Sequence, residues 1–265
     1  MSDFQLPTRD KPVKATRIGP KILILYSKPK VGKTDQLVEL AKMRDMLIID
    51  TEHGTDTYDT VKINCDNMEQ IMYVPQLIEQ QGWVLAAAGK TGLDKFPYTF
   101  LALDTLTQIE DMAVISATAK YKASAIGKAF EGDTVLDLPR GLGYYYLREE
   151  VKMVVKAYAA VCPYLIMIAH LNEKTITGKD EKGTTEVKVN DISLTGKLAG
   201  IISALADGIG YMYRDKKGEL RLSFETHSEA TMGSRQKYLA GKDLPFSWST
   251  IYPDVFPPAE EAVKP

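Results

Sequence analysis

The chain reads ILILYSKPKVGKT at residues 22–34, an apolar run followed by a basic loop that ends in Gly-Lys-Thr. Residues 22–26 have the length and composition of a buried strand. After the loop, Leu37 and Leu40 recur at helical spacing, which predicts a helix over residues 34–43. A strand, a tight loop and a helix are thus expected in direct succession.

The loop at residues 27–34, SKPKVGKT, matches the pattern of a phosphate-binding P-loop. In such a loop, backbone N–H groups surround a phosphate at a helix N-terminus, where the helix dipole favours anions. Gly32 would allow the close approach, Lys33 would reach the β- and γ-phosphates, and the Thr34 hydroxyl would bind Mg²⁺. The predicted ATP-binding residues are Ser27, Lys28, Pro29, Lys30, Val31, Gly32, Lys33, Thr34 and Asp35.

Three positions in this loop admit a second interpretation. Ser27 replaces the first glycine of the pattern, and a positive φ at that residue would cost about 1 kcal/mol. Lys28 and Lys30 are explained more simply as solvent-facing lysines than as phosphate ligands.

Acidic residues end two further apolar strands, Met46–Asp50 and Phe100–Asp104. Ligands of an open α/β sheet lie at the carboxyl ends of its strands, so these acids are expected to face the phosphates. Glu52, just after the first of these strands, is the candidate to orient and deprotonate the attacking water, with Asp50 as the lesser candidate. A capping or surface acid is the alternative for Glu52. Asp104 stands in a Walker B pattern and is expected to hold Mg²⁺ together with Thr34.

The remaining periodicity predicts an α/β fold. Further elements are expected as a strand at 164–170, helices at 68–88 and 143–161, and a hairpin at 209–213 and 220–224. Continuous apolar strands between helices predict a mostly parallel central sheet with helices on both faces and a C-terminal antiparallel hairpin. Glycine- and charge-rich segments at 123–143 and 173–196 do not fit this sheet and are expected to be long loops. The predicted division is a basic N-terminal arm at 1–20, a core at 21–242 and a Pro-rich tail at 243–265.

Composition restricts the class of protein. Apolar residues make up 45% and charged residues 26% of the chain, which excludes a disordered, collagen-like or coiled-coil protein. The longest apolar runs are far shorter than the roughly 20 residues of a membrane helix, and no signal peptide is recognised, so a cytoplasmic protein without a membrane partner is expected. The net charge of −2 gives no overall attraction to polyanions.

Four segments in this order resemble the RecA-like recombinase ATPases, in particular the core-only versions encoded by bacteriophages. The segments are SKPKVGKT (27–34), IIDTEHGTD (48–56), FLALDT (100–105) and YLIMIAHLN (164–172). The resemblance covers roughly residues 20–240 and implies a RecA-like P-loop NTPase core. It also implies ATP hydrolysis with Mg²⁺ at the interfaces between subunits.

The resemblance assigns roles to individual residues. Glu52 falls on the catalytic glutamate of the recombinases. His170 stands where they usually have a glutamine that senses the γ-phosphate and passes its state to the following DNA-binding loop; a buried structural histidine is the alternative. Arg235 and Lys237 resemble a basic pair that reaches the neighbouring subunit's nucleotide, and an ordinary exposed pair is the alternative.

The implied DNA-binding loops are residues 123–143 and 172–196. The function expected from the resemblance is ATP-dependent DNA annealing or strand exchange on single-stranded DNA. The expected partners are that DNA, further copies of the chain in a filament or ring, and a single-strand-binding protein, in the host cytoplasm if a phage encodes the chain. Two alternatives stay open: an annealing module that uses nucleotide only as a regulatory ligand, and a helicase-type motor of the RecA superfamily.

Overall fold

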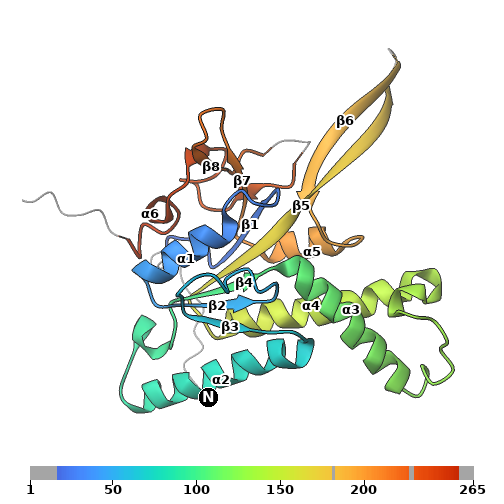
Figure 1. The fold of residues 1–265 in the computed structure, drawn as a ribbon, viewed down its shortest axis with the longest axis horizontal. Coiled ribbons are helices and arrows are strands. Elements are labelled where there is room, and N and C mark those ends of the chain that lie inside the picture. Colours follow the sequence, from blue (N-terminus) through green and yellow to red (C-terminus); the bar gives the residue numbers. More distant parts are fainter. Residues whose placement is uncertain (1–16, 181–182, 227–229, 257–265) are drawn as a thin grey trace, which may run out of the picture.

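A mostly parallel sheet forms the centre of the protein (Figure 1). The computed structural model describes residues 17–180, 183–226 and 230–256. The strands along the sheet are β1 (Ile22–Ser27), β2 (Met46–Asp50), β3 (Lys62–Asn64), β4 (Phe100–Asp104), β5 (Tyr164–Asp180), β7 (Gly208–Arg214), β8 (Leu220–Ser223) and β10 (Asp243–Pro245). Their order is β10-β8-β7-β1-β5-β4-β2-β3. The strands from β7 to β3 are parallel, while β8 and β10 pair antiparallel at one edge. The predicted fold class is confirmed.

Helices cover both faces of this sheet. The helices are α1 (Lys33–Met43), α2 (Met68–Ala87), α3 (Leu106–Ala123), α4 (Leu142–Ala160), α5 (Leu198–Leu205) and α6 (Trp248–Ile251). Successive side chains of a strand point to opposite faces, and β1 shows this alternation clearly. Leu23 and Leu25 pack in the core beneath α1 and α6, whereas Ile24 and Tyr26 pack in the core beneath α2, α3 and α4. Burial on both faces explains why β1 is a continuous apolar run.

The helices predicted at 68–88 and 143–161 are confirmed as α2 and α4, and the C-terminal hairpin is confirmed as β7 and β8. Between α3 and α4 the chain forms only short 3₁₀ helices at Val135–Asp137 and Pro139–Gly141, in agreement with the predicted loop. The prediction of a second long loop, at 173–196, is wrong.

In place of that loop, β5 continues to Asp180 and pairs antiparallel with β6 (Gly183–Ile192), so that a two-stranded ribbon projects from the body of the protein (Figure 1). The segment contains many β-branched residues, which favour strands: Thr175, Ile176, Thr177, Thr184, Thr185, Val187 and Val189. Its high charge suggested a loop, but the β-branched residues favour the strands that are observed.

The packed structure also extends past residue 242, so the predicted boundary of the tail lies too early. β10 pairs with β8, and Trp248, Ile251 and Tyr252 are buried in the core beneath α1. The Trp248 indole N–H donates to the Gln36 carbonyl of α1 at 2.9 Å. The large area of these aromatic side chains outweighs the effect of the neighbouring prolines.

The predicted arm at 1–20 is described only from residue 17. Its last residues pack against the C-terminal segment: Gly19 is buried, and the backbone N–H groups of Ile18 and Gly19 donate to the Asp254 carboxylate at 3.1 and 3.3 Å.

Trp248→Ala is expected to lower the free energy of unfolding by about 3–5 kcal/mol, because it empties a buried site and removes the hydrogen bond to α1. Urea unfolding followed by circular dichroism measures this change. Thr250→Ala, at an exposed position on the same short helix, is the control and should change stability by less than about 0.5 kcal/mol. Equal stability of the two variants would contradict the inclusion of this segment in the core.

Candidate nucleotide-binding site

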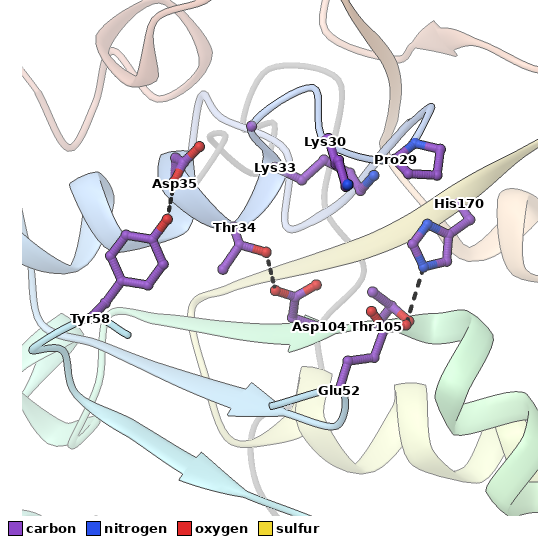
Figure 2. Close-up of a pocket in the computed structure, with 11 residues that line it drawn as sticks. Pro29, Lys30, Lys33, Thr34, Asp35, Glu52, Tyr58, Asp104, Thr105 and His170 are labelled. Atoms are coloured by element: carbon purple, nitrogen blue, oxygen red, sulfur yellow. Dashed lines mark hydrogen bonds and ion pairs between the residues drawn. The ribbon is translucent and has the colours of Figure 1, made fainter. Parts of the chain in front are cut away.

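A cavity of about 410 Å³ opens at the carboxyl ends of β1, β2, β4 and β5 (Figure 2). One wall is formed by the P-loop and the first turn of α1, which contribute Pro29, Lys30, Gly32, Lys33, Thr34 and Asp35. The other wall contains Glu52, Tyr58, Asp104, Thr105 and His170. The site therefore brings the P-loop together with Glu52, which follows β2, and Asp104, which ends β4.

The backbone of the loop makes room for a ligand at Gly32. This residue has φ 114°, a conformation that residues with a side chain rarely adopt. A Cβ atom on Gly32 would lie 3.3 Å from Asp35 Oδ2 and 3.4 Å from Arg214 Nη2. The other positive φ in the loop is 63° at Lys30. Ser27 is the last residue of β1 and has no positive φ, so the expected cost of serine at this position does not arise.

The amino group of Lys33 is held by oxygens of its own loop. Its Nζ donates to Ser27 Oγ at 2.9 Å and to the carbonyls of Ser27 and Lys28 at 3.4 and 3.3 Å. Burial lowers the pKa of Lys33, because desolvation disfavours the charged form. Phosphate oxygens entering the cavity can replace these neutral acceptors.

Thr34 and Asp104 meet at the floor of the cavity, where the threonine hydroxyl donates to Asp104 Oδ2 at 2.9 Å (Figure 2). Burial raises the pKa of Asp104 to about 6, and the nearby charges of Asp50 and Glu52 act in the same direction. The Thr34 hydroxyl and the Asp104 carboxylate are the kind of oxygen ligands that Mg²⁺ prefers. A bound cation would also offset the cost of the buried negative charge on Asp104. The side chains therefore fit the predicted metal ion.

Two carboxylates near the end of β2 have different surroundings. Asp50 is fully buried and accepts hydrogen bonds from the backbone N–H groups of Glu52, Gly54 and Thr55 and from the Thr55 hydroxyl. It therefore fixes the turn that follows the strand. Glu52 is the carboxylate that lines the cavity, which favours it over Asp50 as the candidate base.

Glu52 Oε1 accepts a hydrogen bond from Thr105 Oγ1 at 2.7 Å and lies 3.1 Å from His170 Nε2 (Figure 2). Residues from β4 and β5 thus orient the carboxylate that follows β2. The His170 Nδ1 atom is buried and has no hydrogen-bond partner among the described residues. Glu52 and His170 were each predicted as site residues, and they lie in contact in one cavity. Their chemical roles remain predictions.

Three residues of the predicted cradle do not line the cavity. Ser27 lies behind Lys33, Val31 packs against the core beneath α1, and Lys28 forms an ion pair with Glu173 of β5 at 2.6 Å. Their places in the fold favour supporting roles over direct contact with a phosphate.

Arg235 and Lys237 also lie away from the cavity. Arg235 Nη1 contacts Asp207 Oδ1 at 3.1 Å, and Asp207 Oδ2 in turn accepts hydrogen bonds from the backbone at the start of β1. The P-loop follows the carboxyl end of β1, whereas Arg235 lies near its amino end, on the opposite side of the sheet from the cavity. Lys237, two residues further on, is exposed.

Tyr58 and Thr105 line the cavity but were not among the predicted site residues. The Tyr58 hydroxyl donates to Asp35 Oδ1 across the mouth of the cavity (Figure 2). Thr105 directly follows Asp104, and its hydroxyl also accepts a hydrogen bond from the backbone N–H of Gln108 at the start of α3. A threonine directly after a strand is a helix N-cap signal, so Thr105 is the one of the two that has a signal in the sequence.

A family model described as an AAA domain matches residues 19–236. The chain belongs to the AAA domain family. The match includes the P-loop, both acidic strand ends and His170, so this AAA domain is a nucleotide-binding P-loop ATPase. No curated protein matches the chain. Within the described part of this AAA domain protein, no helix has the length and apolar character needed to cross a membrane.

Gly32→Ala is expected to weaken nucleotide binding by at least about tenfold, because the added methyl group strains the loop and crowds Asp35 and Arg214. Titration with a fluorescent ATP analogue measures the affinity. Gly89→Ala is a matched control, since Gly89 has φ 82° with nothing within 4 Å of its Cβ position. It should cost about 1 kcal/mol of stability and leave the affinity unchanged. Wild-type affinity in Gly32→Ala would contradict the proposed cradle.

Asp104→Asn is expected to stabilise the nucleotide-free protein by about 1–3 kcal/mol at pH 8 while weakening binding of Mg²⁺-nucleotide. The folded-state pKa of about 6 lies above the ordinary value of 3.8, so ionisation of Asp104 costs stability above pH 6. That cost fades as the pH falls towards 4, and the advantage of asparagine should shrink with it.

Urea unfolding of the wild type and of Asp104→Asn at several pH values measures this advantage. Asp59→Asn, which removes an exposed carboxylate, is the control and should show no such pH-dependent gain. A stability difference that stays constant from pH 8 to pH 5 would contradict the buried, unfavourable charge at Asp104.

Proposed function

We propose that this ATPase is a RecA-like recombination protein of the core-only kind, which binds single-stranded DNA and hydrolyses ATP between copies of itself. The observation that carries the proposal is the course of β5. At His170 this strand lines the nucleotide cavity, and it then continues without interruption into the projecting ribbon that it forms with β6 (Figure 1). One strand thus connects the site of ATP with the element proposed to contact DNA.

The side chains of the cavity support hydrolysis. Lys33 Nζ is placed to exchange its loop oxygens for those of the β- and γ-phosphates. Mg²⁺ held by Thr34 and Asp104 would neutralise charge on the same phosphates. Glu52 accepts the proton of the attacking water, and the hydrogen bond from Thr105 fixes the carboxylate for this task. His170, in contact with Glu52, takes the position of the γ-phosphate sensor.

The two segments proposed to bind DNA lie close together at the start of α4. A Cβ on Gly196, just beyond the ribbon, would lie 3.6 Å from the ring of Tyr144. Tyr145 is 52% exposed and available to stack on a base. Tyr146 packs on Tyr121 with ring centroids 5.2 Å apart and belongs to a small core. The proximity of Gly196 and Tyr144 supports one continuous DNA-binding surface formed by both segments, with Tyr145 as its aromatic residue.

The position of Arg235 supports a head-to-tail assembly. The cavity lies at the carboxyl edge of the sheet, whereas Arg235 and Lys237 are exposed near its amino edge. A cation at the opposite edge reaches a nucleotide only in a neighbouring copy. Interfaces of this heterologous type form rings or filaments, and a cation supplied across them stabilises charge that develops during phosphoryl transfer.

Glu52→Gln is expected to reduce ATP hydrolysis by about 10²-fold or more while keeping nucleotide affinity within a few fold, because the amide keeps the shape of the carboxylate but cannot accept the proton. Phosphate release and binding of a fluorescent ATP analogue measure the two effects. Glu69→Gln, at an exposed position on α2, is the control and should hydrolyse ATP normally.

The DNA half of the proposal has its own test. Wild-type hydrolysis should rise on addition of single-stranded DNA, and negative-stain images with DNA and a non-hydrolysable ATP analogue should show filaments or rings. Hydrolysis that ignores DNA would contradict this half. If Glu52→Gln anneals DNA as well as the wild type does, the protein is instead an annealing module in which nucleotide is a regulatory ligand. Strand unwinding by a closed hexamer would identify a helicase-type motor.

A further inference from the structure

Lys28 belongs to the P-loop, but its side chain turns away from the cavity and towards the ribbon. Its Nζ lies 2.6 Å from Glu173 Oε1, and Glu173 follows His170 by three residues on β5. Both side chains of the pair are about half exposed, with 59% and 47% of their surface accessible. The P-loop and the base of the ribbon are therefore joined by an ion pair that lies outside the site of the nucleotide.

The backbone of Lys28 contacts Lys33, the residue whose amino group turns to phosphate in the proposed function. The Lys28 carbonyl accepts one hydrogen bond from Ser27 Oγ at 2.7 Å and another from Lys33 Nζ at 3.3 Å. Lys33 leaves this carbonyl when its amino group turns to a phosphate oxygen. A continuous series of contacts thus leads from the cavity through Lys33 and Lys28 to Glu173.

The return strand of the ribbon is anchored differently. The Ser193 carbonyl accepts a hydrogen bond from Thr107 Oγ1 at 3.3 Å, and the Thr195 backbone N–H donates to Glu110 at 2.8 Å. Glu110 is buried in α3, with only 5% of its surface accessible. Because a buried contact is harder to break than an exposed ion pair, the pair of Lys28 with Glu173 is the weaker of these contacts at the base of the ribbon.

We propose that Lys28 is a positioning residue through which occupancy of the P-loop changes the position of the β5–β6 ribbon. When Lys33 turns to phosphate, the Lys28 backbone loses a donor, the loop relaxes and the pair with Glu173 loosens. This link is separate from the contact between Glu52 and His170. It rests on the nucleotide half of the proposed function and does not require DNA.

Exchange of the two charges tests the link. Lys28→Glu, Glu173→Lys and the double variant are compared with the wild type by hydrogen–deuterium exchange of the backbone amides at 171–192, with and without Mg²⁺ and ATPγS. An exposed ion pair shifts a local equilibrium by about two- to fivefold, so exchange in the wild type should rise by that factor with nucleotide. In each single variant like charges face each other, and the nucleotide-dependent difference should disappear. The double variant should recover it.

The pair of Lys42 with Glu39 on α1 provides a matched control, with a distance of 2.7 Å and accessible fractions of 60% and 53%. Its charge exchange, Glu39→Lys with Lys42→Glu, should leave the response of the ribbon unchanged. The proposal is overturned if the wild type shows no response, or if the double variant stays like the single ones. Weak nucleotide binding in both variants that carry Lys28→Glu would instead identify Lys28 as a phosphate ligand.

DNA binding is measured separately on the same proteins, by the anisotropy of a labelled oligonucleotide. A ribbon that responds to nucleotide in a protein that ignores DNA would contradict the DNA half of the proposed function and leave the role of Lys28 intact. Normal DNA binding without any effect of the charge exchange would support the DNA half of the proposed function and contradict the role of Lys28.

Discussion

The position of β5 between β1 and β4 is the constraint on which the site depends. β1 carries the P-loop and β4 ends in Asp104, yet the two strands do not pair, because β5 hydrogen-bonds to both. Thr34 bridges this gap by its hydrogen bond to Asp104. A cavity at such a switch in strand order is where ligands bind in open α/β sheets. The same arrangement places His170 of β5 between the loop and Glu52.

The sequence predicts most of this sheet, because strands buried on both faces are continuous apolar runs between helical segments. It also predicts acids at or just after the ends of β2 and β4, two of which, Glu52 and Asp104, line the cavity. α3 was missed because apolar residues such as Val114 and Ile115 interrupt the regular spacing of Ile109 and Ala113. The ribbon was missed because its charged residues suggested a loop, although its β-branched residues favour strands.

Side-chain partners across the site were beyond prediction from the sequence. The direction in which Lys28 points, or the contact of Thr105 with Glu52, depends on strand order and on side-chain rotamers, and neither has a periodic signal. Asp50 and Glu52 illustrate the limit. Both follow from the sequence as acids at the end of β2, but only the hydrogen bonds that enclose Asp50 distinguish the structural carboxylate from the one that lines the cavity.

The ribbon has a mechanical consequence. Its ladder runs from the pair Leu171 and Ile192 at the body to the pair Asp180 and Gly183 at the far end. At about 3.3 Å per residue this is an arm of roughly 30 Å, so a tilt of about 10° at its base displaces the far end by about 5 Å. A small rotation where the ribbon joins the body thus becomes a large movement at its far end.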